Sequence, residues 1–233
     1  GVGIHLHNCE GETETANAYE RFNMSEVEAY EEFGLLGPDC QLVHNIWLTD
    51  RDKEIIAEYD CSCITCPSTN TKITDGMPPM PDLHSLGVNI AIGCDGESSS
   101  GTYDMLQEAR LVSLLGKVST MDAAIFTAEE TFEMMTKNGL KAIGFDAKVG
   151  EIKPGYNADI TIIKYPSPHL IDENRLLSNL IYSGTGGDVI SVMVDGKPLY
   201  WNGEMTQINE EEVMTKILES MRKGDHLLPK ITF

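Results

Sequence analysis

Short apolar runs alternate with longer amphipathic stretches through the first part of the chain. Residues 42–44 and 88–92 are apolar without alternating polar positions, which is typical of strands buried on both faces of a parallel sheet. Runs of strand length predict strands over residues 3–7, 40–44, 61–66 and 88–94. The stretches between them predict helices over residues 14–33, 50–59 and 79–86. Strands that alternate with helices favour an α/β fold with a parallel sheet.

The pattern changes towards the end of the chain. Apolar positions keep a helical spacing over residues 103–116 and 121–140, where Gly139 or Gly144 would end a helix. After Val149, turn and strand signals predict strands over residues 158–164, 189–194 and 197–201 and a last amphipathic helix over residues 209–223. Asp195 and Gly196 predict the hairpin turn between the last two strands. We therefore expect four β/α units followed by a small β-rich part.

Polar side chains stand where three of the predicted strands end. His7 closes the first strand with Glu10 just beyond it, His44 closes the second, and Asp95 follows the fourth. A β/α barrel builds its active site at this end of its strands. A catalytic zinc needs about three or four ligands, and His7 and Asp95 could supply two of them. Glu10 could carry a proton, His44 could orient the attacking group, and Asp95 could also take the proton of a metal-bound water.

Each of these residues has an ordinary structural role as its alternative. A single histidine at a strand end is more often structural, and an aspartate before glycine usually belongs to a turn. Only the combination of His7, Glu10, His44 and Asp95 favours a catalytic site.

Composition limits the classes of partner. The formal net charge is −20, with 17 lysines and arginines, which argues against a nucleic-acid or anionic membrane surface because such surfaces need basic residues. No stretch of about 18 uncharged apolar residues is present, so we expect no membrane span. The acidic residues crowd into residues 10–32 and 210–212, where solvated helix faces explain them.

The cysteines indicate a reducing compartment. Most of the six lie in or beside apolar strand-like segments, which favours buried reduced thiols and a cytoplasmic protein. Cys61, Cys63 and Cys66 could alternatively form a small thiolate metal site, although their spacing lacks the paired two-residue gaps of a zinc ribbon.

These motifs together resemble the amidohydrolase superfamily, in the cytosine-deaminase-like branch that includes methylthioadenosine/S-adenosylhomocysteine deaminases, guanine deaminases and triazine hydrolases. Residues 4–10 look like the metal histidine of the family's fifth strand with its glutamate, and residues 43–44 look like the sixth-strand histidine. Residues 66–72 resemble the segment after strand seven, and residues 93–96 the eighth-strand metal aspartate. Residues 149–160 and 194–197 are similar to the return from barrel to sandwich and to a late hairpin.

The resemblance implies a fold and a reaction. Residues 1–148 would be the C-terminal half, strands five to eight, of a metal-dependent (β/α)8 barrel, and residues 149–233 a β-sandwich portion with a C-terminal helix. The activity implied is hydrolytic deamination of an aminated heterocycle, such as a purine nucleoside, by a hydroxide bound to Zn²⁺ or alternatively Fe²⁺.

The same resemblance implies the roles of the site residues. His7 and Asp95 would bind the metal, and Asp95 would accept the proton of the attacking water. Glu10 would protonate the ring nitrogen, and His44 would hydrogen-bond the attacking oxygen. Glu10, His44 and Ser99 would contact the substrate, although a plain loop role for Ser99 is an equal alternative.

The family's chemistry also needs a His-x-His pair on a first strand, which does not precede Gly1. His5 and His7 form such a string, but the order of Glu10, His44 and Asp95 after it favours strand five. We therefore expect a C-terminal half that needs a missing N-terminal half as its partner, because four units alone leave two unpaired sheet edges.

Two alternatives to a deaminase stay open. One is a triazine-type hydrolytic dehalogenase or deaminase, and the other is a catalytically silent half-domain that completes a partner. In each case we expect a small heterocyclic substrate or a protein partner, no nucleic acid, no membrane, and a homo-oligomer, the common state of such enzymes.

Overall fold

The structure, a computed structural model, describes residues 2–144 and 148–224. The chain divides into two units, Gly1–Glu151 with Tyr165–Asp188, and Ile152–Lys164 with Val189–Phe233. We expected a single boundary after residue 148, but residues 165–188 group with the first unit. Their helix α10 (Leu176–Ser183) packs against α7 (Met105–Thr120) and α8 (Ala128–Met135), which explains the difference.

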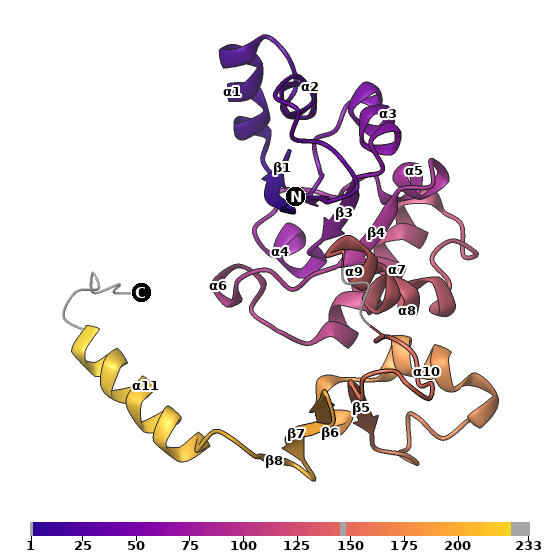
Figure 1. The fold of residues 1–233 in the computed structure, drawn as a ribbon, viewed down its shortest axis with the longest axis vertical. Helices are drawn as coiled ribbons and strands as arrows, with labels where there is room; N and C mark the ends of the chain where they lie inside the picture. The colour runs from indigo at the N-terminus through magenta and orange to yellow at the C-terminus, as the bar shows by residue number, and fades with distance from the viewer. Residues whose placement is uncertain (1, 145–147, 225–233) are drawn as a thin grey trace. The chain divides into compact units, whose positions relative to one another are not determined.

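Four parallel strands form the sheet of the first unit, in the order β1-β2-β3-β4 (Figure 1). They span Ile4–Asn8, Cys40–His44, Ser62–Thr65 and Asn89–Ile92, which confirms the four predicted strands. Strands β2 and β4 are buried along their whole length, whereas β1 alternates between partly buried and exposed side chains up to His7 and ends on the buried Asn8. Asn8 lies beside His44 in the register of β1 and β2, so both strands end at the same edge of the sheet.

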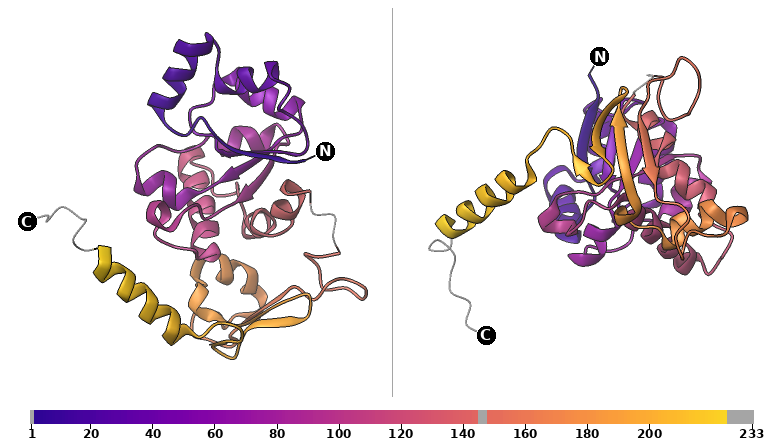
Figure 2. Two further views of the ribbon diagram at one scale, coloured as in Figure 1. Left: turned by 60° about the vertical axis from the view of Figure 1, so that its left-hand side comes forward. Right: turned by 90° about the horizontal axis from the view of Figure 1, so that it is seen from below.

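Helices follow the strands and pack around the sheet, as Figure 2 shows. Helices α5 (Met80–Ser85), α7, α8 and α9 (Lys137–Ala142) contact β4. Besides α7, α8 and α10, the described part of the first unit contains α1 (Glu12–Phe22), α2 (Glu26–Glu32), α3 (Asp50–Glu58), α4 (Pro67–Lys72), α5 (Met80–Ser85), α6 (Glu97–Ser100) and α9 (Lys137–Ala142), with short 3-10 turns at Glu173–Arg175 and Gly186–Asp188.

Capping residues set the helix boundaries and correct two predictions. The helix predicted over residues 14–33 is two helices, because Asn23 adopts a left-handed conformation and Ser25 begins α2 with a capping box to Glu28. The stretch predicted as helical over residues 121–140 begins only after Thr127, which caps α8. Thr49 caps α3, which begins at Asp50, where the sequence predicts the start of a helix.

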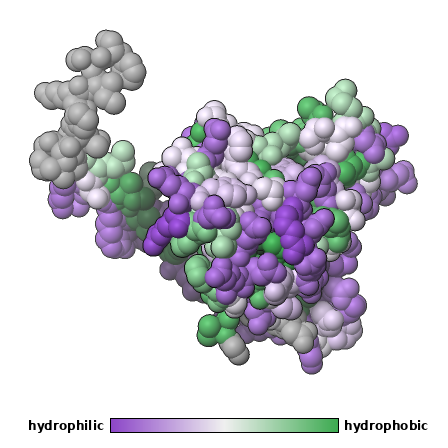
Figure 3. Space-filling view, turned by 90° about the horizontal axis from the view of Figure 1, so that it is seen from above, coloured by the Kyte–Doolittle hydropathy of each residue, from purple (hydrophilic) through white to green (hydrophobic). Residues whose placement is uncertain are grey.

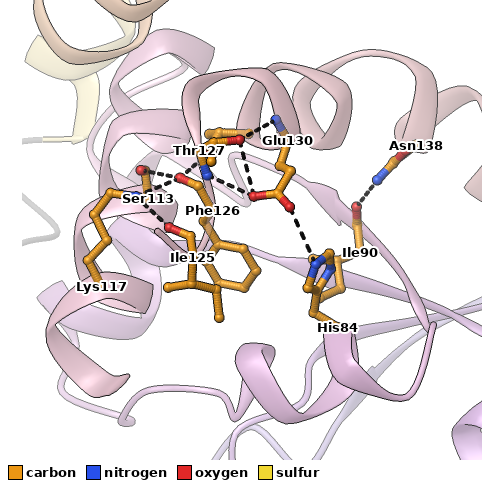
Figure 4. Close-up of polar contacts among 10 residues, drawn as sticks. His84, Ile90, Ser113, Lys117, Ile125, Phe126, Thr127, Glu130 and Asn138 are labelled. Atoms are coloured by element: carbon orange, nitrogen blue, oxygen red, sulfur yellow. Dashed lines mark hydrogen bonds and ion pairs between the residues drawn. The ribbon is translucent and has the colours of Figure 1, made fainter. Parts of the chain in front are cut away.

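The chain between α7 and α8 is fixed by hydrogen bonds to one buried carbonyl group (Figure 4). The Phe126 carbonyl accepts from Ser113 Oγ at 2.7 Å and from Lys117 Nζ at 2.9 Å. His84 Nε2 lies 3.7 Å from Glu130 Oε1, and its ring packs edge-on against the Phe126 ring. Phe126 is fully buried and belongs to the core formed by the sheet and its helices.

The second unit holds an antiparallel sheet in the order β5-β6-β7-β8. Its strands are Ile160–Ile163, Val189–Val194, Lys197–Trp201 and Glu204–Met205, and they are followed by α11 (Glu210–Gly224). Asp195 and Gly196 join β6 to β7 with φ angles of 49° and 72°. Positive φ at both positions is the two-residue hairpin turn that the sequence predicts, and glycine adopts it without strain.

The surface and the thiols agree with the composition. On the face drawn in Figure 3, hydrophilic residues lie among hydrophobic ones. All six cysteines are free, with five of them buried as expected and Cys94 partly exposed. Within residues 2–144 and 148–224, every helix is too short or too polar to cross a membrane.

Candidate active site

Three side chains from separate strand ends meet at the carboxyl edge of the parallel sheet. Glu10 follows β1, His44 ends β2, and Asp95 follows β4. One potential ligand atom from each lies within 4.8 Å of the other two. Three of the four residues of the predicted site, Glu10, His44 and Asp95, therefore lie together at this edge, and His7 is not part of the group.

The backbone at this edge is unusual. Cys9, His44 and Asp95 have φ angles of 48°, 74° and 60°, which residues other than glycine rarely adopt. The Cys9 carbonyl accepts from the amides of Ile46 and Trp47, at 3.0 and 2.9 Å. These bonds tie the turn that carries Glu10 to the turn that follows His44, so the local strain is maintained by the contacts around it.

A buried carboxyl group holds the other side of the Glu10 turn. The Cys9 amide donates to Glu26 Oε2 at 2.7 Å, and Glu26 is 7% exposed. Glu26 Oε1 is buried without a hydrogen-bond partner among the described residues. Burial raises the pKa of Glu26 above its ordinary value, while the Cys9 amide acts in the opposite direction.

His44 is the most buried member of the site. Its ring is 1% exposed and lies between two polar side chains, with Nδ1 at 2.9 Å from Asn70 Oδ1 and Nε2 at 3.4 Å from Glu10 Oε1. One nitrogen is therefore engaged by the protein, and the other faces the site.

Glu10 occupies the centre of the cluster. Its side chain is 21% exposed, and its Oε2 lies 3.8 Å from His7 Nδ1. Burial raises the pKa of Glu10 above its ordinary value, while the neighbouring His44 and His7 rings lower it. A carboxyl group in this environment can exchange a proton with a bound molecule.

The other two predicted site residues, His7 and Ser99, are not part of the group formed by Glu10, His44 and Asp95. His7 packs edge-on against the His44 ring, with centroids 5.3 Å apart, but its side chain is 66% exposed and lies outside the three-residue group. Ser99 lies on α6, partly buried, and its amide donates to the Gly96 carbonyl. The role of His7 as a metal ligand and the role of Ser99 as a substrate contact therefore stay predictions.

The donor set of the cluster fits a divalent cation. Two carboxylates and an imidazole nitrogen face one another without a basic side chain in the described group, and such oxygen and nitrogen donors suit zinc or iron. A cation bound at Asp95 would also offset the repulsion between the Glu10 and Asp95 carboxylates, whether or not Glu10 is itself a ligand.

Sequence reasoning missed three buried polar residues that support the site. Glu26 was expected only as part of a solvated acidic segment, and Asn70 only as part of the segment after strand seven rather than as the partner of His44. Glu108, which is fully buried on α7, accepts the Ser68 amide at 2.9 Å. The signal for Glu108 was a carboxyl group on the apolar face of a helix, beside Ala109 and Val112.

Comparisons with known proteins show the family of this chain. Residues 1–199 match the amidohydrolase family. The 5-methylthioadenosine/S-adenosylhomocysteine deaminases of Pyrococcus furiosus and Moorella thermoacetica are 37% and 34% identical over 94% and 96% of this chain. In both cases the match covers 52% of the relative, so the chain spans about half the length of these curated relatives.

Solved structures share the fold. An adenosine deaminase from Xanthomonas campestris with bound zinc superposes with a TM-score of 0.91 at 28% identity, over 95% of this chain and 50% of that one. The atrazine chlorohydrolase TrzN from Arthrobacter aurescens, at 18% identity, matches in fold with a TM-score of 0.85 over 94% of this chain and 48% of that one. The chain, with its mixed α/β fold and its strand-end cluster, belongs to the amidohydrolase family.

Proposed function

We propose that this chain forms strands five to eight of a metal-dependent (β/α)8 barrel with a small β-sandwich portion, and that the complete enzyme deaminates an aminated heterocycle. The meeting of Glu10, His44 and Asp95 at the ends of β1, β2 and β4 carries the proposal, because this is where such a barrel performs its chemistry. The names of the relatives favour a purine nucleoside or a related compound as substrate.

We assign the cation to His7 and Asp95, with further ligands from the missing half of the barrel. Zinc in the Xanthomonas campestris structure supports Zn²⁺ over Fe²⁺. When bound, the cation would act as a Lewis acid that activates water.

The other roles follow from what each side chain can donate or accept. Glu10, whose pKa burial raises, would deliver a proton to the ring nitrogen next to the reacting carbon. Asp95 would accept the proton of the attacking water, and His44 would direct Nε2 at the attacking oxygen. Ser99 on α6 would contact the substrate from the rim of the site.

Ammonia release tests the function. The full product of the gene, including any coding sequence before Gly1, is loaded with Zn²⁺ and incubated with adenine nucleosides, guanine, cytosine and aminotriazines. We expect ammonia from the adenine nucleosides. Chloride release from a chlorotriazine instead would identify the dehalogenase alternative, and no reaction at stoichiometric zinc would overturn the proposal in favour of a silent half-domain.

Substitutions at the two carboxylates separate their chemistry from their packing. Glu10→Gln and Asp95→Asn keep the shape of each side chain but remove its proton transfer, so kcat should fall by about 10²- to 10⁴-fold for each. Glu12→Gln is the matched control, because Glu12 is exposed at the start of α1. Equal activity of the control and of Glu10→Gln would contradict the role of Glu10.

A further inference from the structure

The contact between His44 and Asn70 joins two buried groups from different elements. His44 ends β2, Asn70 lies on α4, and each residue is 1% exposed. The atoms that meet are His44 Nδ1 and Asn70 Oδ1, at 2.9 Å. The Asn70 amide nitrogen has no hydrogen-bond partner among the described residues. The Asn70 side chain is therefore held through its oxygen, by the contact with His44.

The chemistry of the amide decides where the imidazole proton lies. With the Asn70 oxygen placed towards the ring, Nδ1 of His44 carries the hydrogen, because a carbonyl oxygen only accepts. The lone pair of the neutral ring is then on Nε2, which lies 3.4 Å from Glu10 Oε1 and can accept a hydrogen bond from that carboxyl group when Glu10 carries its proton. The opposite tautomer would leave Nδ1 and the Asn70 oxygen as two acceptors facing each other inside the protein, which costs free energy.

Helix α4 is itself held by a buried carboxyl group. Glu108 on α7 accepts the Ser68 amide at 2.9 Å in the first turn of α4 and is fully buried. At the other end, the Asn70 carbonyl accepts from the amides of Asp75 and Gly76, at 3.1 and 3.4 Å. Both ends of the segment that carries the Asn70 side chain are therefore fixed.

We propose that Asn70 is a positioning residue that fixes His44 as the Nδ1–H tautomer, and that Glu108 holds α4 so that the Asn70 oxygen faces the ring. The proposal deepens the proposed function, because it leaves Nε2 of His44 free to act in the site. The tautomer does not depend on which reaction the enzyme catalyses.

Nitrogen NMR of the metal-free chain measures the tautomer directly. We record the two ring-nitrogen shifts of His44 at about pH 9, well above the ordinary histidine pKa of about 6.5. We expect a protonated Nδ1 and an unprotonated Nε2. An unprotonated Nδ1, or a ring protonated at both nitrogens, would overturn the proposal.

Variants at Asn70 test the cause. Asn70→Leu removes the acceptor and should give a mixture of tautomers, whereas Asn70→Asp keeps an oxygen at this position and should restore the Nδ1–H form. Glu108→Leu should also give a mixture, and Glu108→Gln, which keeps an acceptor for the Ser68 amide, should not. Unchanged shifts in folded Asn70→Leu would contradict the proposal, and if that variant does not fold, the wild-type and Asn70→Asp shifts decide it.

Asn89→Leu is the matched control. Asn89 is another buried asparagine, which donates to Ser62 Oγ and to the Asn138 carbonyl, but it begins β4 at the opposite end of the strand from Asp95. Asn89→Leu should lower the stability of the fold and leave the ring-nitrogen chemical shifts of His44 unchanged. A change in those shifts equal to that of Asn70→Leu would assign the effect to general destabilisation and overturn the proposal.

Kinetics of the full enzyme separate this inference from the proposed function. Loss of a group that orients a functional histidine typically costs about 10- to 100-fold in activity, and we expect this loss in kcat rather than KM for Asn70→Leu, with recovery in Asn70→Asp. If the enzyme releases no ammonia but the tautomer responds as expected, the proposed function fails and the positioning role stands. If activity is present and the tautomer does not respond, the positioning role fails alone.

Discussion

Two carboxyl groups, Glu26 and Glu108, are buried around the strand ends in the same manner. Each accepts one backbone amide hydrogen bond with one oxygen, and the other oxygen is buried without a partner among the described residues. Burial raises the pKa of both groups above the ordinary value. A protein retains such residues at a cost in stability when they hold a backbone segment in place.

Replacing Glu26 should make this cost visible as a pH dependence. Burial raises the pKa of Glu26 in the folded state. The contribution of Glu26 to folding stability is therefore complete below its unfolded pKa of about 4.3 and is lost as the pH rises through its folded pKa. Glu26→Gln keeps an oxygen for the Cys9 amide and cannot ionise, so its stability should exceed that of the wild type by an amount that grows from pH 4 towards pH 8. Each unit of pKa difference corresponds to about 1.4 kcal/mol.

Urea denaturation across this pH range measures the effect of Glu26→Gln. Glu32→Gln is the control, since Glu32 lies at the exposed end of the same helix, α2, and its replacement should not change the pH dependence. A stability difference between Glu26→Gln and the wild type that shrinks with rising pH would contradict the sign of the shift.

At the scale of single elements, helix α7 is shaped by its contact with Phe126. A Cβ atom added at Gly116 would lie 2.2 Å from Phe126 Cδ2 and 2.6 Å from Cε2. The ring cannot withdraw easily, because the Phe126 carbonyl is fixed by Ser113 and Lys117 (Figure 4). Gly116 is therefore required by close packing and not by the helix itself.

Alanine substitutions at two helical glycines should have opposite effects. Gly116→Ala gains helix propensity of about 1 kcal/mol but overpacks the core at a cost of about 1–3 kcal/mol, so we expect net destabilisation. Gly139→Ala in α9 has no atom within 4 Å of the added Cβ and should stabilise by about 0.5–1 kcal/mol. Thermal unfolding of both variants measures the difference, and stabilisation by Gly116→Ala would show that the Phe126 ring can move.

The strands could be predicted because each is a short run with few polar residues between polar turns. Helix α4 could not, since after Pro67 its residues are all polar and carry no helical periodicity. It forms because proline suits a first turn and because Glu108 accepts the Ser68 amide. Helix α10 was missed because it lies between two strand signals of the second unit while packing in the first.

The site, like the secondary structure, could be predicted where a local sequence signal exists and not where it depends on packing. Glu10, His44 and Asp95 could be predicted to meet, because parallel strands bring their carboxyl ends to one edge. The exposure of His7 could not, since it depends on the position of β1 at the edge of the described sheet. The contact of Asn70 with His44 spans 26 positions of sequence and depends on the packing of α4, which has no local signal.

For the whole molecule, the two edges of the parallel sheet are the feature with the largest consequence. Among the described strands, β1 and β4 each pair on one side only, and the curated relatives are about twice as long as their match to this chain. Additional strands would cover both edges and bring further ligands to the cluster. Metal affinity should therefore depend on the missing half of the proposed barrel.

Zinc binding tests this dependence. With three donors in one group and His7 66% exposed, we expect the 233-residue chain to bind Zn²⁺ weakly and its unfolding midpoint to rise only at high zinc concentration. The full product of the gene should bind tightly, because additional strands would bring further ligands. At 100 times its Kd, zinc should then stabilise the folded state by about 2.7 kcal/mol. Asp95→Asn should reduce the zinc affinity of both forms by about 10-fold or more, whereas Asp122→Asn, at an exposed loop position, should leave it unchanged. Isothermal titration with EDTA-treated protein gives the affinities, and tight binding by the chain alone that survives Asp95→Asn would place the metal outside the strand-end cluster.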